Sequence, residues 1–244
     1  MVVWLFAGGG HSELTLPYFF RKHFPCQFEL KLPVRIRAPL PVKAGERRSL
    51  PKSGMGHSGK GLRDAVQRRL QESLDKQRPP NLILVMDDLD CHDRAWAEQG
   101  LQKAVQSVPN AAGIPLIIAF AVPEIESWLL ADWDHTFGTH TTFRSCSAAM
   151  RHYLSRVSKV NFAHPETFSE YDPAKKSCKE KLSEAIADAY LNCPGEEYFS
   201  KREDTGALLP LLDPAIVASK CPHFRQFWSE LRQQCATDVA PHGT

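Results

Sequence analysis

Three continuous apolar runs mark the first half of the chain: residues 2–7 (VVWLFA), 81–88 (NLILVMDD) and 114–122 (IPLIIAFAV). Short runs without polar alternation are typical of strands that are buried on both faces of a parallel sheet. A fourth segment, residues 28–40, alternates apolar and polar positions and contains two prolines. This pattern predicts an extended segment or a strand at the edge of the sheet.

Between these runs the apolar residues recur at helical spacing, which predicts helices over residues 12–23, 62–77, 94–108 and 123–133. Ser12 is the expected N-cap of the first helix, and Pro123 the expected first residue of the last. Beyond residue 140 the strand pattern stops, and helices are expected over 144–159, 177–192 and 222–235. The pattern therefore predicts an α/β core over 1–140, with a parallel sheet flanked by helices, and a helical C-terminal region over 141–244 packed on it.

Composition narrows the class of protein only slightly. The chain has 244 residues, with 30 basic and 28 acidic side chains, so its total charge indicates no polyanionic partner. Seven cysteines without a C-x-x-C pair argue against a zinc ribbon or a dithiol redox motif, and their odd number suggests a reducing compartment. The N-terminus lacks a basic leader, and no apolar run approaches the length of a membrane span. We expect a cytoplasmic protein without a membrane contact.

Acidic residues follow each of the three apolar runs. Glu13 lies beyond the first, Asp87, Asp88 and Asp90 close the second, and Glu124 and Glu126 follow the third. The carboxyl ends of parallel strands meet at one edge of a sheet, where ligands bind. An Asp-x-Asp pair such as Asp88 and Asp90 can share one direction and hold Mg²⁺ or Mn²⁺ through oxygen atoms.

Each acid also has a structural interpretation. Asp93 can cap the helix that follows it, and Glu124 and Glu126 lie where a helix dipole favours negative charge. It is the convergence of three acidic segments on one edge, rather than any single acid, that favours a metal site. Such an ion can activate water and stabilise charge on a phosphoryl group.

The order of these motifs resembles the TOPRIM pattern of topoisomerases, primases and overcoming-lysogenization-defect (OLD) nucleases. In that pattern a strand and a Gly-rich turn with a glutamate precede a strand that ends in Asp-x-Asp. The chain is more closely similar to small TOPRIM-like bacterial proteins that carry segments like PEIESWLLAD and EYFSKREDTGALLPLLDPAIVASKCPHF. The N-terminal element departs from the commoner form, because Ala7 stands where a first glutamate is usual.

The resemblance implies specific roles. Glu13 would be a general acid/base or a metal ligand, and Asp88 and Asp90 would be metal ligands. Glu126 would be a further acid at this edge, and Asp132 is another candidate. Lys201 would stabilise charge at the phosphate, with Lys175 and Lys176 as alternatives. Such relatives are often encoded beside an ABC-type ATPase, which implies an effector of anti-phage defence with an ATPase partner.

A basic segment accompanies the acids. Arg47, Arg48, Lys52 and Lys60 lie close together in sequence and suit a nucleic-acid backbone, although a solvated loop is equally compatible with them. The stretch GMGHSGKG lacks the hydroxyl residue and the preceding strand of a P-loop. His92 stands where the haloacid-dehalogenase phosphatases need Thr or Val.

Three functions follow from these observations. The leading hypothesis is a magnesium- or manganese-dependent phosphodiester hydrolase, a nuclease acting on DNA or RNA. The second is a non-catalytic TOPRIM-fold subunit or toxin module within an ATPase complex. The third is a small-molecule phosphohydrolase, which predicts a closed pocket. The sequence is compatible with a monomer or an oligomer.

Overall fold

The computed structural model describes residues 1–8, 14–32, 58–193, 199–201 and 203–237. Its centre is a parallel four-stranded sheet with the strand order β2-β1-β3-β4. The strands are β1 (Val2–Ala7), β2 (Gln27–Leu32), β3 (Leu82–Asp88) and β4 (Leu116–Ala121). The three apolar runs thus form the two inner strands, β1 and β3, and one edge strand, β4, and the alternating segment forms the other edge strand, β2. The predicted α/β fold is confirmed.

The strand register brings the ends of β1, β3 and β4 to one edge of the sheet. Ala7 pairs with Met86, and Asp88 pairs with Ala121. The chain passes from β1 to β2 on one side and to β3 on the other, so the order reverses between β1 and β3. In parallel α/β sheets this switch point opens a crevice at the carboxyl ends of the strands.

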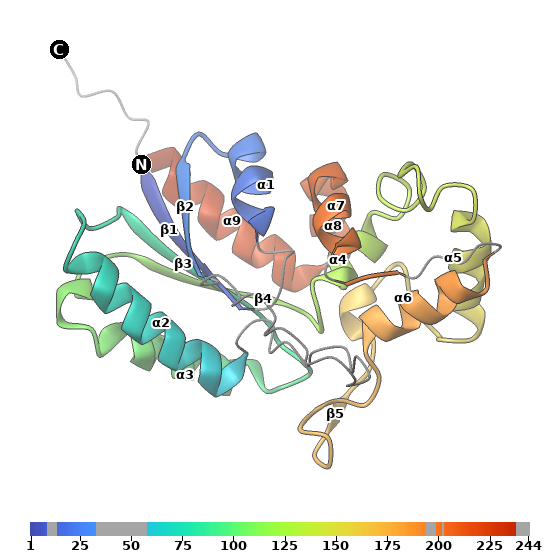
Figure 1. The fold of residues 1–244 in the computed structure, drawn as a ribbon, viewed down its shortest axis with the longest axis horizontal. Helices are drawn as coiled ribbons and strands as arrows, with labels where there is room; N and C mark the ends of the chain where they lie inside the picture. The colour runs from blue at the N-terminus through green and yellow to red at the C-terminus, as the bar shows by residue number, and fades with distance from the viewer. Residues whose placement is uncertain (9–13, 33–57, 194–198, 202, 238–244) are drawn as a thin grey trace, which may run out of the picture.

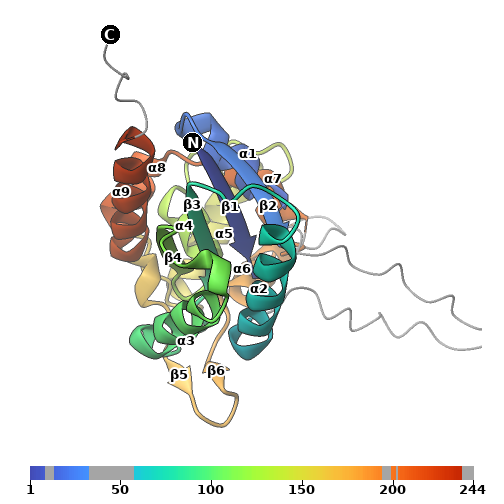
Figure 2. The ribbon, with the colours of Figure 1, turned by 90° about the vertical axis from the view of Figure 1, so that its left-hand side faces the viewer.

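Helices cover both faces of the sheet (Figures 1 and 2). α2 (Gly59–Leu74) and α3 (Arg94–Gln106) pack on the face formed by Trp4, Phe6 and Val85. α1 (Leu16–His23) and α9 (Pro222–Thr237) pack on the opposite face. Because successive side chains of a strand point to opposite faces, both faces need apolar residues, and this explains the continuous apolar runs.

The C-terminal region is helical, as predicted. The predicted core ends with α4 (Glu126–Ala131), and the helices beyond residue 140 are α5 (Ser147–Arg156), α6 (Leu182–Leu191), α7 (Asp204–Leu208), α8 (Pro214–Lys220) and α9. The helix α9 lays an aromatic stripe on the core: Phe224 contacts the ring of Trp128, and Trp228 contacts Phe24. One continuous apolar core joins this region to the sheet.

Several predicted boundaries were wrong. α1 begins at Leu16 with Thr15 as its N-cap, rather than at Ser12. α4 begins at Glu126 after a cis Val122–Pro123 bond, so Pro123 precedes the helix. Strands do not end at residue 140, because β5 (Tyr171–Asp172) and β6 (Ser177–Cys178) form a small hairpin, and β6 lies where the start of a helix was expected. α7 and α8 lie in segments that we expected to be breaks. Two-residue strands and one- or two-turn helices leave no periodicity to detect.

Two disulfides join distant segments, Cys91–Cys178 and Cys146–Cys193. The first ties the segment after β3 to the β5–β6 hairpin, with Cα atoms 5.0 Å apart across 87 residues of sequence. Sequence spacing gives no sign of either pair, because each depends on tertiary proximity. None of the helices in the described part of the chain is long and apolar enough to cross a membrane.

Candidate functional site

The acids that end β3 diverge from one another. Asp87 faces α2 and accepts a hydrogen bond from the backbone N–H of Gly59 at 3.2 Å. Asp88 faces the other way, and its Oδ1 accepts from the N–H of Ile125 at 2.9 Å. Asp90 follows in the left-handed region, with φ 49°. Asp87 and Asp88 therefore point in different directions, and a hydrogen bond ties Asp88 directly to the segment after β4.

That segment supplies two buried carboxylates, Glu124 and Glu126, both 0% exposed. Glu124 Oε2 accepts from the N–H of Ser183 at 3.3 Å, at the start of α6. Glu126 lies in the first turn of α4, and its Oε1 accepts from Thr205 Oγ1 at 2.8 Å. The predicted position at the start of a helix is therefore correct for Glu126, whereas Glu124 precedes the helix; both side chains are buried.

Lys201 is the centre of this group. Its Nζ lies 3.1 Å from Asp88 Oδ2, 3.1 Å from Glu124 Oε2 and 3.2 Å from Glu126 Oε2. Lys201 follows α6 by ten residues, and the preceding residues 194–198 lie outside the described part of the chain. The sequence resemblance nominated Lys201 for this edge, and the fold brings it there.

A second lysine completes what we call the acid–lysine cluster: Asp88, Asp90, Glu124, Glu126, Lys181 and Lys201. Lys181 Nζ lies 3.1 Å from Asp90 Oδ1 and 3.9 Å from Glu124 Oε1. Lys181 is not among the residues predicted from the sequence, and Glu124 was predicted at this edge without a ligand role. Lys181 lies in a run of charged residues beside a small hairpin, and no sequence signal separates it from its neighbours.

Burial and mutual repulsion shift the acidity of the cluster. Burial, together with the neighbouring Asp88 and Glu124, raises the pKa of Glu126 to about 7 against the opposing effect of Lys201. Burial also raises the pKa of Asp88, although Lys201 opposes this. For Glu124 burial is outweighed by Lys201, Ser183 and Lys181, so its pKa is lowered. The three surrounding carboxylates hold the pKa of Lys201 above its ordinary value despite burial.

The carboxylates of the cluster outnumber its lysines, which leaves negative charge that a cation could neutralise. Four carboxyl groups share two ammonium groups, so two negative charges remain when all are ionised. Glu124 Oε1 and Glu126 Oε2 are buried and accept no hydrogen bond, although Lys201 Nζ is near the second. Oxygen-only donors of this kind suit Mg²⁺ or Mn²⁺. Within the described residues no three His, Cys, Asp or Glu side chains form a ready-made metal cage, and the point between Asp88, Glu124 and Glu126 is taken by Lys201.

The remaining predicted residues fall into two groups. Glu13, Arg47, Arg48 and Lys52 lie outside the described residues, so their roles stay predictions. The chain toward Glu13 does leave the sheet beside the cluster, because Gly8 N–H donates to the carbonyl of Met86 at 2.8 Å. Lys60 is exposed in the first turn of α2.

The structure does not bring Asp132, Lys175 or Lys176 into the cluster. Asp132 is buried, but its oxygens accept from the Asp213 N–H and contact His135, so it organises the segment after α4. Lys175 and Lys176 are exposed between the strands of the β5–β6 hairpin.

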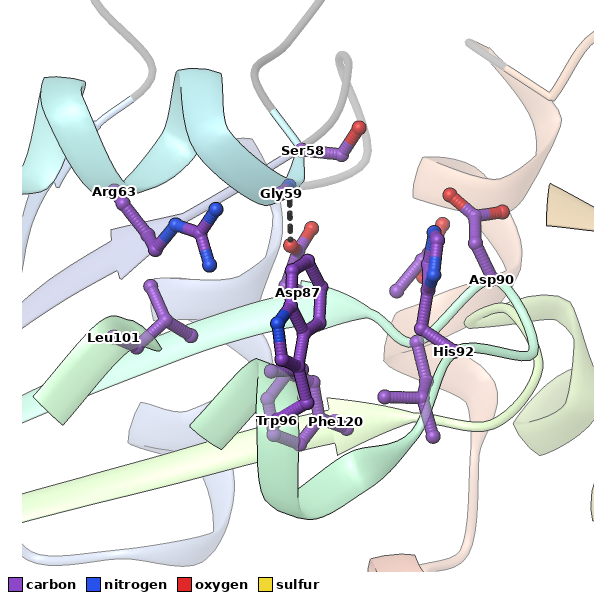
Figure 3. Close-up of a pocket in the computed structure, with 12 residues that line it drawn as sticks. Ser58, Gly59, Arg63, Asp87, Asp90, His92, Trp96, Leu101 and Phe120 are labelled. Atoms are coloured by element: carbon purple, nitrogen blue, oxygen red, sulfur yellow. Dashed lines mark hydrogen bonds between the residues drawn. The ribbon is translucent and has the colours of Figure 1, made fainter. Parts of the chain in front are cut away.

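A pocket opens beside the cluster, between the end of β3 and the starts of α2 and α3 (Figure 3). Asp87 lies at its centre, with Arg63 on one side and His92 and Asp90 on the other. Trp96 stands in front of Asp87. The pocket is lined by Ser58, Gly59, Arg63, Asp87, Asp88, Leu89, Asp90, His92, Trp96, Ala97, Leu101 and Phe120. The pocket is partly enclosed, and the third hypothesis, a small-molecule phosphohydrolase, stays a prediction.

Stability is expected to fall as pH rises from about 4.5 to about 7, and Glu126→Gln is expected to reduce this dependence. The folded pKa of Glu126 is about 7 and its ordinary value 4.5, so in this window the folded state binds more protons than the unfolded state. The contribution is on the order of 3 kcal/mol across the window, since one pKa unit corresponds to about 1.4 kcal/mol. Gln keeps an acceptor for Thr205. Urea unfolding from pH 4.5 to 7.5, with a chelator present, measures the effect.

The matched control is Glu72→Gln, a carboxylate on α2 whose side chain is 45% exposed. It should keep the wild-type pH dependence. A Glu126→Gln variant with the same slope as wild type would show that this carboxyl is not the group responsible.

Comparison with known proteins identifies a family but no described relative. The family model described as "Domain of unknown function (DUF4276)" matches residues 10–232. Neither the curated proteins nor the solved structures contain a match. The matched range includes every member of the acid–lysine cluster.

Proposed function

We propose that this chain, which belongs to the DUF4276 family, is a metal-dependent phosphodiester hydrolase that acts on nucleic acid. The observation that carries the proposal is the acid–lysine cluster: carboxylates from the ends of β3 and β4 converge with two lysines at the carboxyl edge of a parallel sheet. Acids with perturbed pKa values at such an edge are candidates for a functional site, because ligands bind at the carboxyl ends of parallel strands.

The residues divide into cation-binding and charge-stabilising groups. Asp88, Asp90 and Glu126, with Glu13 from the segment after β1, would hold the ion, and the buried Glu124 would add a ligand or orient the lysines. When bound, Mg²⁺ or Mn²⁺ would supply positive charge to the phosphoryl oxygens and activate water. Lys201 would then turn from the carboxylates toward the developing negative charge, where an ammonium stabilises the transition state.

The resemblance to TOPRIM proteins supports the same proposal at a finer level. The TOPRIM pattern has a glutamate after a first strand and an Asp-x-Asp pair at the end of a later one. In this chain β3 ends at Asp88, two residues before Asp90, and Glu13 lies outside the described residues. We propose a TOPRIM-like nuclease of the OLD type. Its proposed setting, anti-phage defence beside an ABC-type ATPase, rests on the resemblance alone. The cytoplasmic location proposed from the cysteine pattern is opposed by the two disulfides, because disulfides are rare in a reducing compartment.

The test is divalent-ion-dependent cleavage. Wild-type protein should cleave at least one substrate in a panel of plasmid, single-stranded DNA and tRNA with Mg²⁺ or Mn²⁺, and cleavage should stop when a chelator is added. Glu13→Ala should lose the activity if Glu13 belongs to the site. Cleavage that survives the chelator, or no cleavage of any substrate, would contradict an autonomous metal-dependent nuclease.

One observation favours a second function, a non-catalytic module. Lys201 already contacts three of the carboxylates, and Lys181 contacts Asp90, so the cluster has its own counter-charges without an ion. Buried ion-pair networks of this kind also occur as purely structural features. In this case titration with Mn²⁺ should detect no binding and no increase in the thermal midpoint.

A further inference from the structure

Three aromatic side chains form an exposed shelf beside the acid–lysine cluster. The ring centroid of His92 lies 5.8 Å from that of Trp96 and 5.0 Å from that of Tyr171. We call this set the aromatic shelf. Trp96 is 53% exposed and Tyr171 41% exposed. Among the described residues, Tyr18 on α1 is the other exposed large aromatic, so two of three lie on this shelf.

The shelf is assembled from two segments that the cluster also uses. His92 lies two residues beyond Asp90, and Trp96 lies in the first turn of α3, where its N–H donates to Asp93 at 2.7 Å. Tyr171 belongs to β5, and the Cys91–Cys178 disulfide ties this hairpin to the segment that carries His92. The rings are therefore held at a fixed place next to Asp90.

Basic side chains border the shelf. The guanidinium of Arg63 lies 5.0 Å from the centroid of the Trp96 ring. Gly100 allows this approach, because a Cβ there would lie 2.3 Å from Arg63 Nη1. Lys175 and Lys176 are exposed on the hairpin next to Tyr171, and Lys60 is exposed at the start of α2. The surroundings thus combine stacking surfaces with positive charge, next to carboxylates that suit a cation.

We propose that the aromatic shelf of His92, Trp96 and Tyr171 binds an unpaired nucleobase, so that the substrate is a single-stranded segment of nucleic acid. The inference rests on the proposed function, because it names the substrate class of that site. Base–aromatic stacking combined with a basic surface is the usual way to hold single strands without reading their sequence. A base inside a duplex is already stacked on both faces and cannot use the shelf.

The chemistry of an unpaired base is shared by DNA and RNA, so the test compares both. Fluorescently labelled oligo(dT), oligo(rU) and a blunt DNA duplex of equal length are bound to wild type and to Trp96→Ala in EDTA, where no cleavage occurs. Trp96→Ala should weaken single-strand binding by about 10-fold, since one stacked base contributes about 1–3 kcal/mol. Duplex binding should change by less than a factor of about two. Trp96→Phe, which keeps a ring, should retain most of the affinity.

Tyr18→Ala removes an exposed aromatic that lies off the shelf, and it should leave binding unchanged. Equal single-strand affinity in wild type and Trp96→Ala, or equal losses for single strand and duplex, would overturn the proposal. These experiments distinguish failure of the base-binding proposal from failure of the proposed hydrolase. Single-strand binding that depends on Trp96, without any ion-dependent cleavage, would support base binding by the shelf and contradict the hydrolase. Ion-dependent cleavage that Trp96→Ala does not change would support the hydrolase and contradict base binding by the shelf.

Discussion

Replacing Asp88 by asparagine is expected to lower ion-dependent cleavage on the order of 100-fold or more, as when one charged contact to a transition state is removed. Asp88 is the acid that links the two sides of the site. One oxygen accepts from the N–H of Ile125, and the other contacts Lys201. Asparagine can keep the first bond but removes the negative charge that a cation and Lys201 need. Initial rates at saturating Mn²⁺ on the best substrate of the panel measure the effect.

The fold should survive this change. Burial and neighbouring acids already raise the pKa of Asp88, so removing its charge relieves repulsion with Glu124 and Asp90. Asp134→Asn is a matched control, because that side chain is 85% exposed and lies outside the cluster. Full cleavage by a correctly folded Asp88→Asn protein would remove Asp88 from the proposed mechanism.

The second large effect is expected from Lys201→Met, which should lower the free energy of unfolding by about 3 kcal/mol without divalent ions at pH 7. Methionine keeps much of the side-chain volume but leaves Glu124 and Glu126 buried beside Asp88 without their shared ammonium group. Uptake of protons by these carboxyls limits the loss. Chemical unfolding in EDTA measures it.

The same variant separates the two candidate functions. If the cluster binds a cation, Mn²⁺ should restore more stability to Lys201→Met than it adds to wild type, because the ion replaces the missing charge. Lys201→Arg should keep most of the stability, and Lys179→Met, which removes a surface partner of Glu170, should change it little. Loss of stability that Mn²⁺ does not restore would favour the structural ion-pair network and the non-catalytic module.

Much of the fold was predictable because it depends on local patterns. The apolar runs correspond to β1, β3 and β4, since a strand buried on both faces must be apolar at every position. Asp93 caps α3 as predicted, because a cap depends on neighbouring residues only. The starts of α1 and α4 were missed by three or four residues, and the β5–β6 hairpin was missed entirely, because such short features carry too few residues to show a period.

The sequence by itself also indicated that the acids after β3 and β4 share an edge, because parallel strands place their carboxyl ends together. Only the tertiary structure decided how these acids are used. It directs Asp87 toward α2 and Asp88 toward α4, and it brings Lys181 and Lys201 from about 90 to 110 residues away into contact with them. It also joins Tyr171 to His92 and Cys178 to Cys91. These contacts link residues far apart in the chain, and no local periodicity or spacing encodes them.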